Sequence, residues 1–383
     1  MDFQFLLPTK IIMQAGLRAH TGEHLKELGL QHVLLVTDQG VKRAGVLNSI
    51  YSSLDTAEVR YSEVCDVKPN PRADDCNAAA QQYRGQGIDG ILAVGGGSAM
   101  DAAKAISILL THEGKIEDYE GSFTLNNPTL PIIAIPSSAG TGSEVTFFSV
   151  ITDTQRQFKM SILDYQIGPV LALLDSEITA TLPPAIAAST GMDALTHAIE
   201  SYTCKLANPI SDGLALHAIR LISQNIKAAV QEPDNQDARE QMLIASLIAG
   251  MAFGNADIAS VHCISEAIGG MYDTPHGVGN AIFLPFVFRH NRDADLRRHA
   301  DVAYALGIDP TLDATTATEC AVEHLFTMSS ELGIPRFSEV AGVREEDFQI
   351  IAEQSQNNMS NSSNAKPMNV DSYLTIIQQA YQY

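Results

Sequence analysis

Short apolar runs alternate with amphipathic stretches between residue 31 and about residue 174. Runs of that length, each followed by a helical period, are typical of a parallel sheet with helices on its faces. The pattern predicts strands at 32–37, 58–64, 90–94 and 131–135, and helices at 41–54, 72–86 and 102–110. This order of elements indicates an α/β domain in the first half of the chain.

After Leu182 and two prolines the alternation fades, and long helical periods take its place. These periods predict helices at 185–202, 210–230, 238–253, 258–268, 281–291, 296–305, 316–332, 345–356 and 370–381. A polar run at 354–364 is expected to be an exposed loop. The chain should therefore form two domains, an α/β domain over residues 1–180 and an all-helical domain over residues 181–383.

Composition narrows the class of protein. The 383 residues are 45% hydrophobic and carry a formal net charge of −21, which argues against nucleic acid and anionic membranes as partners. No apolar run approaches membrane-spanning length, and the first residues lack the pattern of a secretory signal. Five scattered cysteines without CxxC spacing favour a reducing compartment, so we expect a cytoplasmic protein.

Two segments of the helical half carry polar residues at helical spacing among small and apolar neighbours. Asp193 and His197 are four apart in the first segment, and His262 and Glu266 are four apart in the second. Each pair shares one face of a helix. Taken alone, the first pair has an ordinary explanation as a hydrogen bond within a helix, and His262 as a core histidine. The repeated pattern favours a functional cluster.

A third histidine completes the pattern. We expect Gly269 and Gly270 to end the second helix, and Pro275 to stiffen a turn that presents His276. The candidate ligands are then Asp193, His197, His262 and His276. Three imidazole nitrogens and one carboxylate oxygen suit iron(II), zinc, manganese or cobalt, with room for a substrate oxygen.

Two runs rich in glycine, serine and threonine each follow a predicted strand, GGGSAMD at 95–101 and SSAGTGSEVT at 137–146. Backbone N–H groups at such strand–turn–helix junctions suit a phosphate. Neither run is GxGxxG, and similar turns occur without ligands, but two at the carboxyl ends of parallel strands mark where α/β sheets bind ligands. Asp38, at the end of the first strand, either accepts hydrogen bonds from a ribose or simply caps a turn.

Five segments occur together in a fixed order: VTDQG at 36–40, GGGSAMD at 95–101, SSAGTGSEVT at 137–146, TGMDALTHAIESY at 190–202 and HGVGNA at 276–281. With them the chain resembles the iron-containing (group III) alcohol dehydrogenase family over essentially its whole length. The resemblance implies a dinucleotide-binding α/β domain followed by an all-helical domain for metal and substrate, the dehydroquinate synthase-like fold. It also implies a homodimer or a higher homo-oligomer.

The resemblance assigns roles residue by residue. The family's metal ligands match Asp193, His197, His262 and His276. Its cofactor contacts match Gly96, Gly97, Ser98 and Asp101 at the pyrophosphate, Ser137, Ser138 and Thr141 beside the nicotinamide, Lys159 near the ribose and Asn70 on the adenosine side. Ser137 and Ser138 stand where two threonines are usual. Asp38 matches a carboxylate of NAD-preferring members, because it would repel a 2′-phosphate.

The implied reaction is hydride transfer between NAD(H) and a small primary alcohol or aldehyde, with Fe(II), or else zinc, as a Lewis acid on the substrate oxygen. Glu266 departs from the family, since many members carry a histidine there. It is a candidate, with Thr141, for proton transfer, and alternatively a fifth ligand, a substrate-amine contact or support for His262. A zinc-dependent polyol dehydrogenase of the glycerol type, a dehydroquinate synthase-like lyase and a catalytically weak NAD- and metal-binding protein remain open as alternatives.

Overall fold

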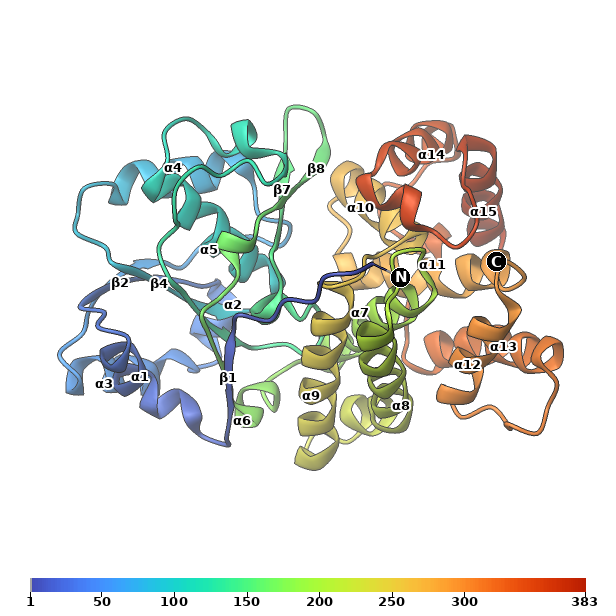
Figure 1. Cartoon of the computed structure of the whole chain (residues 1–383), viewed down its shortest axis with the longest axis horizontal. Coiled ribbons are helices and arrows are strands. Elements are labelled where there is room, and N and C mark those ends of the chain that lie inside the picture. Colours follow the sequence, from blue (N-terminus) through green and yellow to red (C-terminus); the bar gives the residue numbers. More distant parts are fainter. Residues whose placement is uncertain (1) are drawn as a thin grey trace. The chain divides into compact units, whose positions relative to one another are not determined.

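The computed structural model describes residues 2–383 and divides into two compact units. The α/β unit comprises Leu7–Ser138 and Ser143–Leu182. The helical unit comprises Pro183–Tyr383, the residues up to Leu6 and a short inserted segment, Ala139–Gly142. In Figure 1 the first unit is coloured mainly blue to green and the second mainly yellow-green to red.

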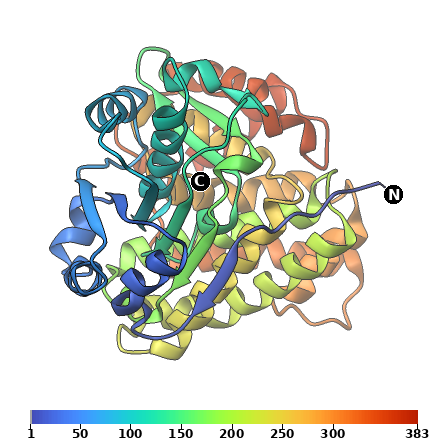
Figure 2. The same ribbon diagram turned by 60° about the vertical axis from the view of Figure 1, so that its left-hand side comes forward.

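The α/β unit is built on one parallel sheet, with strand order β1-β9-β6-β4-β2-β3. The strands are β1 (Lys10–Met13), β2 (His32–Val36), β3 (Arg60–Val64), β4 (Gly90–Gly95), β6 (Ile132–Pro136) and β9 (Leu171–Leu174). Every residue of β2, β4, β6 and β9 is buried, as expected for parallel strands covered on both faces. Figure 2 shows β1, in dark blue, at the edge of this sheet beside β9.

Helices cover both faces of the sheet. The short helices α1 (Thr21–Glu27) and α3 (Leu47–Thr56) pack on one face through Leu25, Ile50 and Leu54. The helices α4 (Ala73–Tyr83) and α5 (Gly97–Thr111) pack on the other face, together with alternate residues of the same strands. The predicted α/β class is confirmed, and Figure 1 shows the two pairs of helices on opposite sides of β2 and β4.

A second, smaller sheet belongs to the same unit and was not predicted from the pattern. It has the order β5-β8-β7, with β5 (Gly121–Ser122), β7 (Phe148–Asp153) and β8 (Phe158–Leu163). The strands β7 and β8 form an antiparallel hairpin. Gln157 has a φ of 49° just before β8, a left-handed conformation that is uncommon outside glycine.

The segment leading into β7 is fixed by a lysine that is fully buried. Lys104 of α5 donates to Ser143 Oγ (2.8 Å), Thr146 Oγ1 (3.2 Å) and the Phe148 carbonyl (2.8 Å), so all three ammonium protons have acceptors. Burial lowers the pKa of Lys104 to about 8, while the nearby carboxylate of Asp101 opposes that shift. The helix α5 therefore anchors the end of the second glycine-rich run.

The helical unit begins with three long helices that pack against one another, α7 (Pro184–Thr203), α8 (Pro209–Gln231) and α9 (Gln236–Phe253). The later helices are α10 (Ser260–Tyr272), α11 (His276–Asn291), α12 (Leu296–Ala305), α13 (Ala314–Glu331), α14 (Phe348–Asn357) and α15 (Val370–Gln382). Each lies close to a predicted range, so the all-helical class is confirmed. None of the helices between residues 2 and 383 is long and apolar enough to cross a bilayer.

Several predicted boundaries were wrong, each for a local reason. The helix predicted at 41–54 is two helices, α2 (Gln39–Arg43) and α3, because Gly45 takes a left-handed φ of 73° between them. The helix predicted at 102–110 begins earlier, at Gly97. The helix α10 passes through Gly269 and Gly270 and ends at Tyr272, where the C-cap residue Asp273 has a φ of 56°.

The residue after Pro275 was expected on a turn, but it is the first residue of a helix. Pro275 is the N-cap of α11, so His276 stands at the start of that helix. Proline is tolerated beside a helix start because the first N–H groups of a helix have no partner within it. The position of His276 is therefore set by the first turn of α11.

The polar run at 354–364 is not an exposed loop. It completes α14 and continues into a short 3-10 helix, Met359–Ser363, in which Ser360 and Ser363 are 4% and 3% exposed. Both serine hydroxyls donate to Asp257, and Asn364 forms a reciprocal amide pair with Asn291. A polar segment can be buried when its partners are buried polar groups, and sequence pattern does not show those partners.

Candidate active site

Four donor side chains come together in the helical unit. Asp193 and His197 lie on α7, His262 on α10 and His276 at the start of α11, and their donor atoms all lie within 4.8 Å of one another. Asp193 Oδ1 is 4.0 Å from His262 Nε2 and 3.7 Å from His276 Nε2. The first three residues are buried, whereas the His276 side chain is 28% exposed. This set of one carboxylate and three imidazoles suits a divalent cation such as Fe(II) or zinc.

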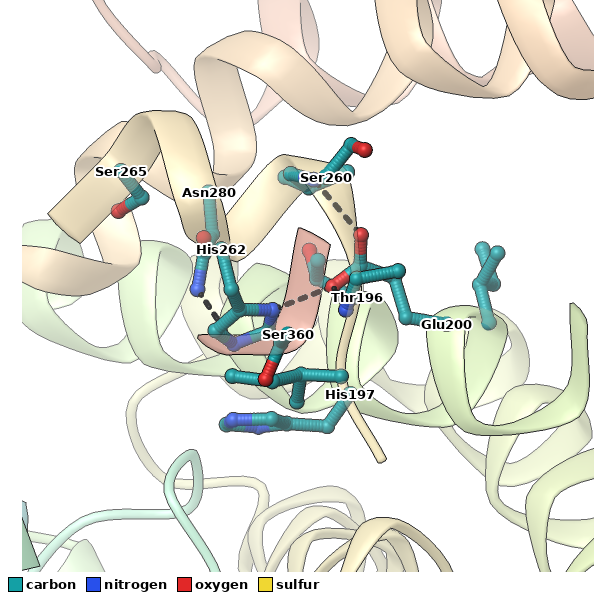
Figure 3. Close-up of polar contacts among 12 residues, drawn as sticks. Thr196, His197, Glu200, Ser260, His262, Ser265, Asn280 and Ser360 are labelled. Atoms are coloured by element: carbon teal, nitrogen blue, oxygen red, sulfur yellow. Dashed lines mark hydrogen bonds and ion pairs between the residues drawn. The ribbon is translucent and has the colours of Figure 1, made fainter. Parts of the chain in front are cut away.

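The orientation of His262 is fixed by a carboxylate that the sequence did not single out. Glu200 Oε2 lies 2.5 Å from His262 Nδ1 (Figure 3) and also accepts the Ala259 N–H at 2.9 Å. Its other oxygen accepts the Val261 N–H at 2.7 Å. Burial raises the pKa of Glu200 to about 7, and the backbone donors oppose that rise. Because Nδ1 faces this carboxylate, the lone pair of His262 is on Nε2, toward the other donor atoms.

The orientation of His197 is fixed by a backbone carbonyl. Its Nδ1 lies 3.3 Å from the Gly140 carbonyl oxygen, which leaves Nε2 for the cluster. The imidazole stacks between Phe253, at a centroid distance of 4.2 Å, and His262, at 4.5 Å. Burial lowers the pKa of His197 to about 4, so the ring is neutral at physiological pH, as a metal ligand must be.

The carbonyl that meets His197 belongs to the inserted segment Ala139–Gly142. A Cβ at Gly140 would lie 2.7 Å from Thr190 Cβ, and one at Gly142 would lie 2.5 Å from the Gly250 Cα. Gly142 also has a φ of 58°. Only glycine allows this close approach of backbone to backbone, so these positions seat the segment on α7 and α9. Thr141 lies between them.

Glu266 is not one of the four clustered donors, although it lies one helical turn after His262. Its carboxylate is buried, at 6% exposure, and accepts the side-chain amide of Asn358 at 2.6 Å. Asn358 Oδ1 in turn accepts the Ser360 N–H, which fixes the amide. Glu266 thus ties α10 to the segment after α14, in addition to any chemical part it plays.

In the α/β unit, the two glycine-rich runs meet at the carboxyl ends of neighbouring strands. Gly95 ends β4, Gly96 is the N-cap of α5, and Gly97 and Ser98 form the first turn of that helix. The Ser137 N–H donates to the Gly95 carbonyl, after β6, at 2.9 Å. A Cβ at Gly96 would be 3.1 Å from Ser138 Oγ. Both runs therefore border the N-terminus of α5, whose free N–H groups and dipole suit a phosphate.

The two carboxylate oxygens of Asp38 face different groups. Oδ1 caps α2 by accepting the N–H groups of Gly40 (2.7 Å) and Val41 (3.0 Å). Oδ2 faces the glycine turn, since a Cβ at Gly95 would lie 3.4 Å from it. The turn-capping role considered from the sequence is therefore present, and the second oxygen lies beside the turn that suits a phosphate.

The other predicted cofactor residues of this unit have protein partners. Lys159 of β8 donates to Asn70 Oδ1 at 2.7 Å, and both residues are buried. The Asp101 carboxylate accepts Ser143 Oγ (3.1 Å) and the Val150 N–H (3.2 Å). Burial raises the pKa of Asp101, while the charge of Lys104 and these hydrogen bonds oppose the rise. Asp101 therefore holds the end of the second run against β7.

Sequence reasoning missed the groups that orient the donors. Glu200 lies seven residues after Asp193 and Asn280 four after His276, so helical spacing could have placed both on the same faces as the candidate ligands. Ser265 donates to the His276 carbonyl at 2.9 Å and lies 3.4 Å from its Nδ1. No local signal distinguishes this serine from the other serines of the chain.

The fold and the site define a class of protein. A parallel α/β unit with glycine turns at its strand ends is suited to a dinucleotide, and the cluster in the helical unit is suited to a divalent metal. These are the parts that a metal-dependent dehydrogenase requires.

Comparisons with known proteins support this class. Residues 8–176 match the model of the iron-containing alcohol dehydrogenases, and residues 187–381 match that of the C-terminal part of the Fe-containing alcohol dehydrogenase family. The 1,3-propanediol dehydrogenase of Klebsiella pneumoniae is 38% identical over 99% of both chains. The NAD-dependent methanol dehydrogenase of Bacillus methanolicus is 33% identical over 98% of this chain and 99% of its own. A crystal structure of 1,3-propanediol oxidoreductase, 38% identical, superposes with a TM-score of 0.95 over 99% of this chain and 100% of its own.

This chain belongs to the iron-containing alcohol dehydrogenase family, as its motifs indicated. It is accordingly an oxidoreductase acting on alcohols and aldehydes.

The contact between Glu200 and His262 generates a prediction. In Glu200→Gln the side chain is neutral and must turn its NH2 group toward at least one of the N–H donors that the carboxylate accepts, so the contact that orients His262 should weaken. We expect metal affinity to fall about ten- to a hundred-fold, with turnover falling alongside it. Elemental analysis after equilibration with a limiting chelator measures the affinity. Glu323→Gln, on an exposed face of α13, is the matched control. Unchanged affinity in Glu200→Gln would show that His262 is oriented by other contacts.

Proposed function

We propose that this protein transfers a hydride between NAD(H) and a small primary alcohol or its aldehyde, using a divalent metal held by Asp193, His197, His262 and His276. The observation that carries the proposal is the convergence of these four donor atoms within 4.8 Å. Family membership supports the reaction class. The printed name of the Bacillus methanolicus relative, an NAD-dependent methanol dehydrogenase, supports the choice of cofactor.

Residues around the donor atoms fix the orientation of the proposed ligand side chains. A divalent metal, when bound, supplies Lewis-acid chemistry toward the substrate oxygen. Glu200 and the Gly140 carbonyl keep the Nε2 atoms of His262 and His197 directed at the cluster. Iron(II) is the ion of the family, and the same donors fit zinc.

We assign the cofactor to the carboxyl ends of β2, β4 and β6. The proposed contacts are Asp38, Asn70, Gly96, Gly97, Ser98, Asp101, Ser137, Ser138, Thr141 and Lys159. The N–H groups at the start of α5 would bind the pyrophosphate. Because Asp101 and the Asn70–Lys159 pair already have protein partners, we assign them to shaping the cofactor site as well as to touching the cofactor.

Glu266 and Thr141 are the residues that we propose for proton transfer. Glu266 is buried on the helix that carries His262, and Asn358 holds one of its oxygens. We favour proton transfer or contact with a polar substrate group over metal ligation, since four ligands are assigned already and the substrate oxygen needs an open position.

We further propose that the protein acts in the cytoplasm as a homodimer or higher homo-oligomer. All five cysteines are free thiols, which suits a reducing compartment. The net charge of −21 disfavours nucleic acid and anionic membranes as partners. The oligomer is the one implied by the family resemblance.

The metal assignment predicts that His262→Ala and His276→Ala abolish both bound metal and activity, because each variant opens a ligand position. Metal affinity should fall by more than the roughly ten- to hundred-fold loss that follows removal of an outer partner. Each protein is loaded with Fe(II) anaerobically, analysed for metal, and assayed with NADH and a panel of short aldehydes. His217→Ala, an exposed histidine on α8, is the control. Full metal content in either variant would remove that residue from the ligand set.

Asp38 should set cofactor choice. The wild type should prefer NAD(H), and Asp38→Gly should narrow the ratio of kcat/KM for NADH over NADPH by about ten-fold or more, about 1.4 kcal/mol per ten-fold. Glycine is the suitable replacement because it serves as an N-cap with a loss of only a few tenths of a kcal/mol, so α2 should survive. A wild type that prefers NADPH would show that Asp38 does not face the ribose.

Glu266→Gln separates charge from packing, since the amide keeps an oxygen that can accept from Asn358. If Glu266 carries the proton, the variant should keep its metal, lose about 10²- to 10⁴-fold in turnover, and lose one limb of its pH–rate profile. Steady-state rates between pH 5 and 10 and metal analysis provide both readouts. Glu331→Gln on α13 is the control. Reduced metal content would instead make Glu266 a ligand, and an unchanged profile would make it purely structural.

A further inference from the structure

The hydroxyl of Ser265 contacts both the backbone and the ring of His276. Ser265 lies on α10, three residues after His262 (Figure 3), and is 1% exposed. Its Oγ donates to the His276 carbonyl at 2.9 Å and lies 3.4 Å from His276 Nδ1. Because the single hydroxyl hydrogen goes to the carbonyl, the oxygen faces Nδ1 with a lone pair. Nδ1 therefore carries the hydrogen of the ring, and the lone pair of the imidazole is on Nε2, toward Asp193.

Two glycines fix the backbone next to His276. A Cβ at Gly277 would lie 2.5 Å from the Ser189 carbonyl oxygen of α7, and a Cβ at Gly279 would lie 2.5 Å from Ser265 Oγ of α10. Only glycine allows approaches this close, so the first turn of α11 is packed tightly against both helices. Movement of His276 is therefore expected to be a rotation of its side chain and not a shift of the helix.

The three imidazoles of the cluster differ in how they are held. Glu200 Oε2 lies 2.5 Å from Nδ1 of His262. The ring of His197 stacks between Phe253 and His262, at centroid distances of 4.2 and 4.5 Å. The ring of His276 is tilted by 50° to that of His262 at 5.2 Å, and its side chain is 28% exposed against 1% for His262. His276 is therefore the ring with room to rotate toward solvent.

The hydroxyl restrains His276 less firmly than a carboxylate would. Hydrogen bonds to an ionised acceptor are roughly twice as strong as those between neutral groups. The carboxylate of Glu200 meets His262, whereas the group that meets His276 Nδ1 from α10 is a neutral hydroxyl at 3.4 Å. Since Ser265 is buried, solvent does not compete for this contact, and its loss should change the restraint on the ring directly.

From these contacts, and resting on the proposed metal site, we infer that His276 is the ligand that opens when the metal enters or leaves. Ser265 is the positioning residue that sets how often it opens. While the hydroxyl holds the ring, Nε2 points toward Asp193. When the side chain rotates outward, a solvent water takes its place. The donors on α7 and α10 stay assembled meanwhile, because Glu200 and the Gly140 carbonyl orient them independently of His276.

The first consequence concerns the rate of metal release. Loss of a hydrogen bond between neutral groups corresponds to a change of about two- to ten-fold, so Ser265→Ala should release metal about two- to ten-fold faster. Gly279→Ala keeps the hydroxyl, but its Cβ would lie 2.5 Å from Ser265 Oγ and should push it aside. This second variant should therefore release metal faster as well, without removing any group that contacts His276.

The rate is measured by mixing Co²⁺-loaded protein with excess EDTA and following the visible absorption of the bound ion, without any assay of turnover. Two EDTA concentrations show whether release or attack by the chelator is being observed. Ser201→Ala is the matched control, since Ser201 is a buried serine of α7 whose hydroxyl donates to the Ala198 carbonyl. Thermal unfolding of the stripped proteins reports on stability separately.

The second consequence concerns which ligand position solvent can reach. Free imidazole should restore Co²⁺ binding to His276→Ala, because the position that this side chain leaves is open to solvent. It should not restore binding to His262→Ala, whose ring position is buried beside Glu200. The measurement is the same visible absorption, with and without added imidazole.

Faster release in Ser265→Ala and Gly279→Ala, with Ser201→Ala like the wild type and rescue of His276→Ala alone, is the expected result. An unchanged release rate in folded Ser265→Ala overturns the inference even if its Tm is lower, since the hydroxyl would then only support packing. If Ser265→Ala does not fold, the rate in Gly279→Ala decides in the same way. Rescue of His262→Ala, or of neither variant, also overturns it. If the wild type binds no Co²⁺, the proposed metal site itself fails, which is a different outcome.

Discussion

A carboxylate buried in an apolar helix needs several hydrogen-bond donors at once. In the helical unit the Glu200 carboxylate has them, and the arrangement of the neighbouring helices depends on it. Glu200 accepts two backbone N–H groups where α10 begins and lies against Nδ1 of His262. The first two contacts fix how α10 enters, and the third fixes which nitrogen of His262 is free. The placement of the donor cluster thus depends on a residue that touches none of the chemistry directly.

The sequence predicted the parts of this molecule that local rules determine. The long helices were found because their apolar positions keep one period for four or five turns, as in α7 and α8. Asp193 and His197 were found because a spacing of four places two side chains on one face whatever lies around them. The buried strands β2, β4 and β6 were found because both of their faces are covered.

What the sequence did not predict depends on partners that are distant along the chain. Glu200 meets residues about 60 positions later, and the serines of the run at 354–364 meet Asp257 about 100 positions earlier. A serine in a polar run looks the same whether water or a carboxylate faces it. Local backbone conformation misled the prediction as well. Gly45 breaks a helix, whereas Gly269 and Gly270 do not. Residue type alone does not separate the two cases.

The segment Ala139–Gly142 has a consequence for dissecting this protein. It lies in the first half of the chain but belongs to the helical unit, as does Leu6, whose backbone exchanges hydrogen bonds with the Asn255 side chain. A fragment starting at residue 183 would carry all four donor side chains. It would lack the Gly140 carbonyl that faces His197 and the Gly142 backbone that packs against Gly250 of α9. Residues 183–383 alone therefore do not contain the whole helical unit. Gene fusions or domain exchanges made with this chain have to move the tip of the second glycine-rich run together with α7 and α9, which it contacts.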